Sequence, residues 1–225
     1  MSSSGGRVAN WLVGDQLACV LHLGDSSLAY RLADLGHEVT ICSPDARHVQ
    51  HELIGYVRAG GERLPFVHDA FDAVVVPDLH DAPVALAEYA RVLRPSGVVS
   101  TVSHAYDDSI PWLRRLREIV GVAPSPVPTA DTLAASGLFH DAETETFAAW
   151  EKLDLAGLIA FARETMDRSR GEAALAEVHT LFRTYAEHTG FLRLRHSTTA
   201  VRARVDKAAL PEQAPPPDTL LLDFR

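Results

Sequence analysis

Four histidines have the chemistry and the placement to serve in a functional site. His48 and His51 are three residues apart, with Glu52 beside them, which is a possible arrangement of metal ligands on one helix face. No third ligand follows at a helical or strand spacing, so we favour a solvated helix face and predict no metal site. His80 and His104 each follow an apolar run and could act as a general base. A surface histidine explains either one as well, so the catalytic residues are left unassigned.

A short polar loop, Gly24-Asp25-Ser26-Ser27, directly follows the apolar run from Leu17 to Leu23. In a parallel sheet such a loop lies at the carboxyl end of a strand, where ligands bind. Nucleotide-binding loops need several glycines so that the backbone can approach the ligand without interference from Cβ atoms. This loop has one glycine and matches neither GxGxxG nor GxxxxGK[ST], and it is not a GxSxG nucleophile elbow. A Rossmann dinucleotide site and a phosphate loop are therefore not predicted.

Strands alternate with helices through the first half of the chain. Short apolar or β-branched runs predict strands at 17–24, 37–42, 71–76 and 98–103. Helices are expected between them, at about 28–35, 46–53 and 84–93, with a turn at 94–97. This alternation is typical of βαβ units with right-handed crossovers, so the fold class is α/β with a parallel sheet.

The rhythm changes in the second half. The pattern predicts a helix at 111–120, a proline-rich connector at 123–128, a strand at 139–150, helices at 154–165 and 171–187, and a last strand at 197–205. We expect one domain over residues 1–205 and a proline-rich C-terminal tail over 206–225. The tail ends in the apolar stretch from Leu220 to Phe224, which predicts that it docks on its own domain or on a partner subunit; a disordered end is the alternative.

Composition excludes several classes of function. The 225 residues include 21 Lys and Arg against 30 Asp and Glu, a formal charge of −9, which argues against nucleic acid and anionic membranes as partners. No apolar run reaches the length of a membrane span, and the first residues have no signal-peptide pattern. Cys19 and Cys42 have no metal-ligand spacing, and free buried thiols suit a cytoplasmic protein.

A series of short segments, in order along the chain, resembles class I SAM-dependent methyltransferases. The segments are Val20-Leu21-His22-Leu23-Gly24, Gly36-His37-Glu38-Val39-Thr40, Arg63-Leu64-Pro65-Phe66, Phe71-Asp72-Ala73-Val74-Val75-Val76 and Ala90-Arg91-Val92-Leu93-Arg94-Pro95-Ser96-Gly97. More narrowly, residues 107–112 and 150–205 are similar to the methyltransferase type 11 or trans-aconitate methyltransferase-like branch. The resemblance implies a Rossmann-like, doubly wound sheet of seven strands, mostly parallel with an antiparallel last strand.

The resemblance also implies where SAM would bind. The cofactor lies over the first, second and fourth strands of the family's sheet, and the corresponding residues here are His22, Gly24, Asp25, Ser26, Cys42, Ser43, Glu62, Arg63, Leu64 and Pro77. His22 and Cys42 stand where the family has acidic residues. The loop after the first strand is about two residues shorter than usual and lacks its later glycines, and no aromatic residue follows the fourth strand. Asp25 and Asp45 could substitute in part for the missing carboxylates.

Two functions follow from these departures. The first is a SAM-dependent methyltransferase-like protein, related to small-molecule methyltransferases, with an eroded cofactor motif. The second is a catalytically inactive pseudo-methyltransferase that binds or scaffolds a partner. The first implies a small-molecule substrate and the second a protein partner; a homodimer is possible in either case, and no metal is expected.

Overall fold

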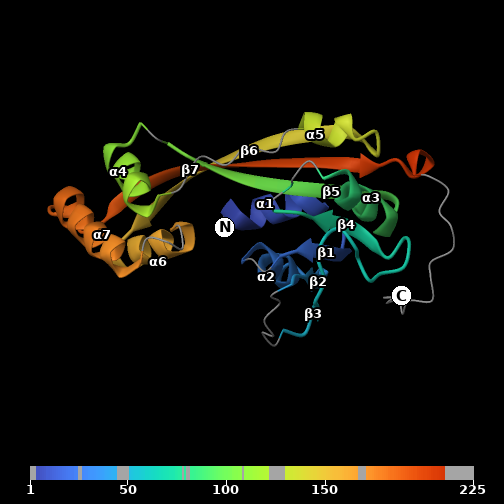
Figure 1. Cartoon of the computed structure of the whole chain (residues 1–225), viewed down its shortest axis with the longest axis horizontal. Coiled ribbons are helices and arrows are strands. Elements are labelled where there is room, and N and C mark those ends of the chain that lie inside the picture. Colours follow the sequence, from blue (N-terminus) through green and yellow to red (C-terminus); the bar gives the residue numbers. More distant parts are fainter. Residues whose placement is uncertain are drawn as a thin grey trace. The chain divides into compact units, whose positions relative to one another are not determined.

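The computed structural model describes residues 4–24, 27–44, 51–77, 79, 82–107, 109–121, 130–166 and 171–210 (Figure 1). The chain divides into two compact units. The first unit comprises Met1–Ser103, Pro128–Phe147 and Thr199–Arg225, and the second comprises His104–Val127 and Ala148–Thr198. Each unit is described by itself below. One domain over residues 1–205 with a separate tail stays a prediction.

The strands form one seven-stranded sheet in the order β3-β2-β1-β4-β5-β7-β6. Their bounds are β1 Cys19–Leu23, β2 Glu38–Cys42, β3 Ile54–Val57, β4 Phe71–Val75, β5 Leu93–Tyr106, β6 Phe139–Leu153 and β7 Leu192–Val205. The pairs β1–β2, β1–β4, β2–β3 and β4–β5 are parallel. Figure 1 shows β7 running against β5 and β6, in agreement with the hydrogen bonds from Asp107 N–H to Arg195 O and from Asp206 N–H to Leu138 O. The predicted doubly wound α/β sheet with an antiparallel last strand is confirmed.

Helices of the first unit cover both faces of its strands, because successive strand residues point to opposite sides. On one side, α1 (Ser4–Val13) and α2 (Ser27–Asp34) pack on alternate residues of β1, β2 and β4, among them Val20, Ile41 and Val75. On the other side, α3 (Pro83–Val92) and α5 (Ala130–Ala135) pack on residues such as Leu21 and Val74. Burial on both faces explains why these strands are mostly apolar and do not alternate strictly between apolar and polar residues.

Helices of the second unit form a core of their own. The helices are α4 (Pro111–Val120), α6 (Leu155–Thr165) and α7 (Gly171–Ala186). Their buried residues include Trp112, Leu158 and Val178. Local sequence signals set the ends: the Asp154 side chain accepts a hydrogen bond from Gly157 N–H at the start of α6, and Gly121 adopts φ +76° at the end of α4.

The first residues after the last strand lie against the first unit. The short 3₁₀ helix η1 (Lys207–Ala209) begins at Asp206, whose side chain accepts a hydrogen bond from Ala208 N–H. The Lys207 ammonium donates to the carbonyl oxygens of Ala90 and Arg91, at the end of α3, and lies 2.6 Å from an Asp69 oxygen. Residues 211–225 are outside the described part of the chain, so the expected docking of Leu220 to Phe224 is not tested.

The structure differs from the sequence-based expectations at a few elements. Helices α1 and α5 and strand β3 were not expected, and the turn expected at 94–97 is wrong, because β5 begins at Leu93 and runs through it. Ser96 has φ +67° there, and the pairing of β4 with β5 shifts register between Phe71 and Ala73, so the turn-like residues form an irregularity within a strand. The helix expected at 46–53 and the connector at 123–128 lie largely outside the described residues. No helix in the described part is long and apolar enough to cross a membrane.

Candidate functional site

The candidate site lies at the carboxyl ends of β1, β2 and β4 in the first unit. In the β1–β2 ladder Leu23 is opposite Cys42, and the Gly24 N–H donates to Cys42 O at 2.8 Å. On the other side of β1, His22 is opposite Val75 of β4. The three strand ends are therefore adjacent, which is the arrangement that a parallel α/β sheet uses for ligand sites.

His22 is fully buried between the neighbouring strands, with an exposed fraction of 0%. Its Nδ1 lies 2.9 Å from the carbonyl oxygen of Gly24, and because a carbonyl only accepts, Nδ1 carries the proton. The imidazole thus offers at most one acceptor nitrogen and no negative charge. A carboxylate at this position would offer two acceptor oxygens and a charge opposite to that of an ammonium or sulfonium group.

Gly24 begins the loop after β1 and has a backbone that favours glycine. Its φ is +81°, a left-handed conformation, and no atom of the described residues lies within 4 Å of the place that a Cβ would occupy. The described residues therefore leave space beside the start of the loop. Asp25 and Ser26, which were expected to contact the cofactor, are outside the described residues.

Cys42 ends β2 and Ser43 follows it, and both are buried residues that bond to the neighbouring backbone. The Cys42 thiol donates to Ala59 O at 3.6 Å, and the Ser43 N–H donates to Val57 O at 3.1 Å. Burial raises the pKa of Cys42 to about 11, with the Ala59 contact acting in the opposite direction. The side chain is therefore a neutral thiol at neutral pH, and it supplies no carboxylate oxygen for ribose hydroxyls.

The segment from Glu62 to Leu64 is held by a buried ion pair on α3. Leu64 N–H donates to the Glu88 carboxylate at 2.8 Å, and Arg91 donates to Leu64 O at 3.0 Å and to Phe66 O at 2.7 Å. Arg91 also pairs with Glu88 at 2.7 Å. Burial acts to raise the pKa of Glu88, but the hydrogen bonds from Arg91 and Leu64 outweigh it and the pKa lies below its ordinary value.

Tyr89, on the same helix, places its phenol beside the ends of β1 and β2. A Cβ added to Gly61 would lie 2.8 Å from the Tyr89 hydroxyl oxygen and 3.3 Å from Leu23, so these three residues are in close contact. Burial is the main cause that raises the pKa of Tyr89 to about 12, and the nearby Cys42 and Glu62 act in the same direction as they ionise. The phenol is therefore neutral and fills space at the edge of the candidate site.

The structure brings most of the expected cofactor residues together. His22, Gly24, Cys42 and Ser43 lie at adjacent strand ends, as described above. Pro77 follows Val76, whose N–H donates to Ser100 O at 2.8 Å, and therefore lies just beyond β4. Glu62 and Arg63 precede the anchored Leu64 in the chain.

Two of the four candidate catalytic and metal-ligating histidines can be placed. His80 and His48 are outside the described residues, and His104 lies on β5 in the second unit, with Nδ1 3.0 Å from the Thr198 hydroxyl oxygen. His51 forms an exposed contact with Asp34 at 3.7 Å. Within the described ranges no group of three His, Cys, Asp or Glu side chains could hold a metal ion.

Sequence reasoning missed Glu88, Arg91 and Tyr89 as residues of the site. The spacing of Glu88 and Arg91, three apart on a predicted helix, was a visible signal for an ion pair. Nothing in the sequence indicated that this pair would bind residues 64 and 66, more than 20 positions earlier. The role of Tyr89 likewise depends on contacts that only the folded chain creates.

The described residues fit SAM only in part. The segment at Leu64 is rigidly placed and the space at Gly24 is open, as an adenosine site requires. The β1 and β2 positions, however, present an imidazole and a neutral thiol, each turned onto a backbone carbonyl. These groups do not reproduce the paired carboxylates that hold an ammonium group and ribose hydroxyls.

Comparison with known proteins finds similarity to methyltransferases over part of the chain. A family model described as methyltransferase domain matches residues 21–101. Uncharacterized methyltransferases of Mycobacterium bovis and Mycobacterium tuberculosis are 31% identical over 139 residues, which is 55% of this chain and 55% of each relative. The chain thus spans about half the length of the curated relatives it matches.

Solved structures agree on the fold. The YcgJ protein from Bacillus subtilis has a TM-score of 0.56 and 14% identity, over 91% of this chain and 98% of that chain. A candidate type II methyltransferase from Anaeromyxobacter dehalogenans has a TM-score of 0.60 and 19% identity, over 89% and 95%. At these identities the likeness concerns the fold alone. The chain is thus similar to methyltransferases over residues 21–101 of its sequence, and it shares its fold with solved methyltransferase structures.

Proposed function

We propose that this chain is a pseudo-methyltransferase, which keeps the fold of small-molecule methyltransferases but binds SAM too weakly for ordinary methyl transfer. The observation that carries the proposal is the pair of residues at the ends of β1 and β2. His22 and Cys42 are buried, bear no negative charge in the state described above, and bond to the backbone at Gly24 and Ala59. A protein partner, rather than a methyl acceptor, is then the expected ligand of the chain.

The size of the effect follows from the missing carboxylates. A hydrogen bond to a charged group contributes about 1.5–3 kcal/mol, so the loss of two such groups costs about 3–6 kcal/mol. At about 1.4 kcal/mol for each factor of ten, SAM binding is weakened by ~10²–10⁴ relative to a site with both carboxylates. Tyr89 adds to this effect, because its phenol occupies space next to Gly61 at the edge of the same site.

An active methyltransferase with a remodelled cofactor loop is the second candidate. Two observations favour it: the open space beside Gly24, and the anchoring of Leu64 by Glu88 and Arg91. In this case Asp25 or Asp45 would supply the missing carboxylate, and the substrate would be a small metabolite. Methyl transfer needs little acid–base help, because SAM carries an activated methyl group and the protein mainly orients the reactants.

Calorimetric titration of the intact chain with SAM and S-adenosylhomocysteine distinguishes the two candidates. The pseudo-methyltransferase predicts no saturable binding below the millimolar range for either ligand. Asp25→Asn and Asp45→Asn are the informative variants, and Asp15→Asn is a matched control away from the strand ends. Micromolar binding that is lost in either informative variant, and kept in the control, establishes the second candidate and contradicts the first.

A cytoplasmic location is part of the same proposal. Cys19 and Cys42 are both free thiols in the structure. A reducing compartment keeps such thiols unpaired. Fractionation of cells expressing the tagged full-length protein tests this location, and recovery with secreted or membrane fractions would contradict it.

A further inference from the structure

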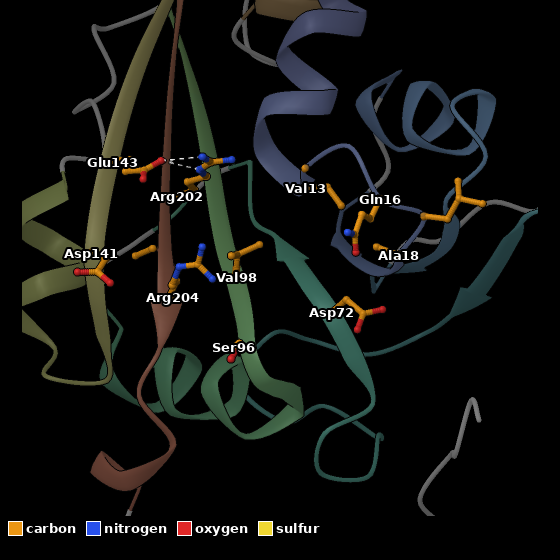
Figure 2. A pocket seen from close by; sticks show the side chains of 13 residues that line it. Val13, Gln16, Ala18, Asp72, Ser96, Val98, Asp141, Glu143, Arg202 and Arg204 are labelled. Carbon is orange, nitrogen blue, oxygen red and sulfur yellow. Dashed lines mark hydrogen bonds and ion pairs between the residues drawn. The ribbon is translucent and has the colours of Figure 1, made fainter.

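A cavity of about 350 Å³ lies at the amino ends of the strands of the first unit (Figure 2). It is lined by the segment from Val13 to Ala18, which leads into β1, and by side chains at the starts of β4, β5 and β6 and at the end of β7. Because β7 is antiparallel, its last residues lie at this same edge of the sheet. The cavity is therefore opposite to the candidate SAM site and shares no residue with it.

Two of the three carboxylates in the cavity wall are already neutralised. Glu143 accepts hydrogen bonds from Arg202 at 2.9 and 2.7 Å, the contact that Figure 2 marks with dashed lines. Arg202 is fixed further by its bond to Trp11 O at 2.7 Å and by the Trp11 ring beneath its guanidinium. Asp72 pairs with Arg94 at 2.7 Å and accepts from Cys19 N–H at 2.9 Å. These groups build the wall of the cavity and have little capacity left for a ligand.

Three other polar side chains in the wall have no hydrogen bond or ion pair to any residue that the structure describes: Arg204, Gln16 and Ser96. Arg204 is on the same face of β7 as Arg202, two residues away, and Figure 2 shows its guanidinium extending toward Val98 of β5. A guanidinium offers five N–H donors in a planar fork that suits a carboxylate. The wall of the cavity therefore contains one guanidinium, that of Arg204, without a partner among the described residues, and the neutral polar side chains of Gln16 and Ser96 lie in the same wall.

The third carboxylate, Asp141, complements this cation. It lies on β6, the strand next to β7, and one of its oxygens accepts from His140 Nδ1 at 2.9 Å. The other oxygen has no partner among the described residues. Asp141 also has φ +51°, a left-handed backbone that a non-glycine residue rarely adopts outside a specific setting.

We propose that this cavity binds a small α-amino carboxylate, with the ligand carboxylate on Arg204 and the ligand ammonium group on Asp141. The charges match, because one free cation and one free carboxylate oxygen face a zwitterion. A dianion such as phosphate would be repelled by the Asp141 carboxylate, which no arginine neutralises among the described residues. The volume is at the lower end of small-molecule sites and suits a ligand of few heavy atoms.

The test is a titration of the ¹⁵N-labelled full-length chain, followed by NMR, with L-alanine, L-leucine, propionate and inorganic phosphate as probes. We expect saturable shifts with at least one of the two amino acids, including the Arg204 side-chain N–H signal, and weaker binding of propionate and phosphate. Arg204→Ala should weaken amino-acid binding by about ten- to a hundredfold, since it removes a charge-assisted contact. Arg114→Ala, which removes an exposed arginine of α4, is the control and should bind as the wild type does.

Asp141→Asn separates the two halves of the proposed contact. Asparagine tolerates the left-handed backbone well, so this variant is expected to fold. It should weaken binding of the amino acid while leaving propionate unchanged. The proposal is overturned if neither amino acid binds saturably, if Arg204→Ala binds as tightly as the wild type, or if phosphate binds as tightly as the amino acids. None of these results depends on SAM binding, because the two sites are at opposite edges of the sheet.

Discussion

The ion pair between Glu88 and Arg91 is expected to be the most sensitive polar contact of the candidate site. Both side chains are mostly buried, with exposed fractions of 18% and 8%. Together they fix the backbone at Leu64 and Phe66, which is the segment expected on the adenine side of the cofactor. Glu88→Ala should therefore destabilise the first unit and displace that segment.

The magnitude follows from what the substitution leaves behind. Arg91 would lose its two bonds to the carboxylate, at 2.7 and 2.8 Å, and Leu64 N–H would lose its acceptor. Removing one partner of a buried pair costs about 3–5 kcal/mol. Since Arg91 keeps its two carbonyl partners, we expect a value near the lower end, about 3 kcal/mol, or a decrease in Tm of about 6–12 °C.

Urea denaturation followed by circular dichroism measures this change. Glu118→Ala is the matched control, because Glu118 also pairs with an arginine three residues away in a helix, but with both side chains more than half exposed. The control should leave the free energy of unfolding unchanged within error, since exposed ion pairs contribute little. The double variant Glu88→Leu/Arg91→Met should recover much of the loss by replacing the pair with apolar packing. Equal effects of Glu88→Ala and Glu118→Ala would refute the reasoning.

Three further predictions concern the same region. Folding lowers the pKa of Glu88, so its ionised form stabilises the fold above about pH 5. The difference in free energy of unfolding between the wild type and Glu88→Gln, measured from urea midpoints, should therefore shrink as the pH is lowered through ~4. A difference that grows toward acid pH would contradict this. Gly61→Ala places a Cβ 2.8 Å from the Tyr89 hydroxyl oxygen, so it should lower the free energy of unfolding by about 1–3 kcal/mol. In a double-mutant cycle, Tyr89→Phe should relieve part of that loss. Additive effects of the two substitutions would exclude the contact. Because burial raises the pKa of Cys42 to about 11, its thiol should react with iodoacetamide at neutral pH only when the chain unfolds. Rapid labelling of Cys42 in the native chain, located by mass spectrometry, would contradict the buried placement.

The parallel core of the fold was predictable because its strands are buried on both faces. The runs at β1, β2 and β4 are short and mostly apolar or β-branched, which is typical of buried strands. The strand β3 escaped prediction because it has only four residues, Ile54-Gly55-Tyr56-Val57, one of them glycine. The helix α1 begins Ser-Gly-Gly, which disfavours a helix, and it is stabilised by the packing of Val8 and Leu12 on the sheet.

The candidate site was predictable in its position but not in its contacts. The family resemblance located His22 and Cys42, and the structure places both at adjacent strand ends. That His22 bonds to Gly24 O, that Tyr89 packs against Gly61, and that Glu88 holds Leu64 all depend on tertiary geometry. The amino-edge cavity was not anticipated at all, because Arg204 and Asp141 are distant in sequence and line the same cavity only because β6 and β7 are neighbours in the sheet.

Calorimetric titration of the wild-type chain with S-adenosylhomocysteine is the most direct test of the central claim, that the site at the ends of β1 and β2 no longer supports ordinary cofactor binding. The absence of carboxylates at His22 and Cys42 predicts no saturable heat up to millimolar ligand. The paired substitution His22→Asp and Cys42→Asp should not restore tight binding by itself, because the loop from Gly24 to Ser27 is short and Gly24 is its one glycine. A micromolar dissociation constant for the wild-type chain would contradict the claim.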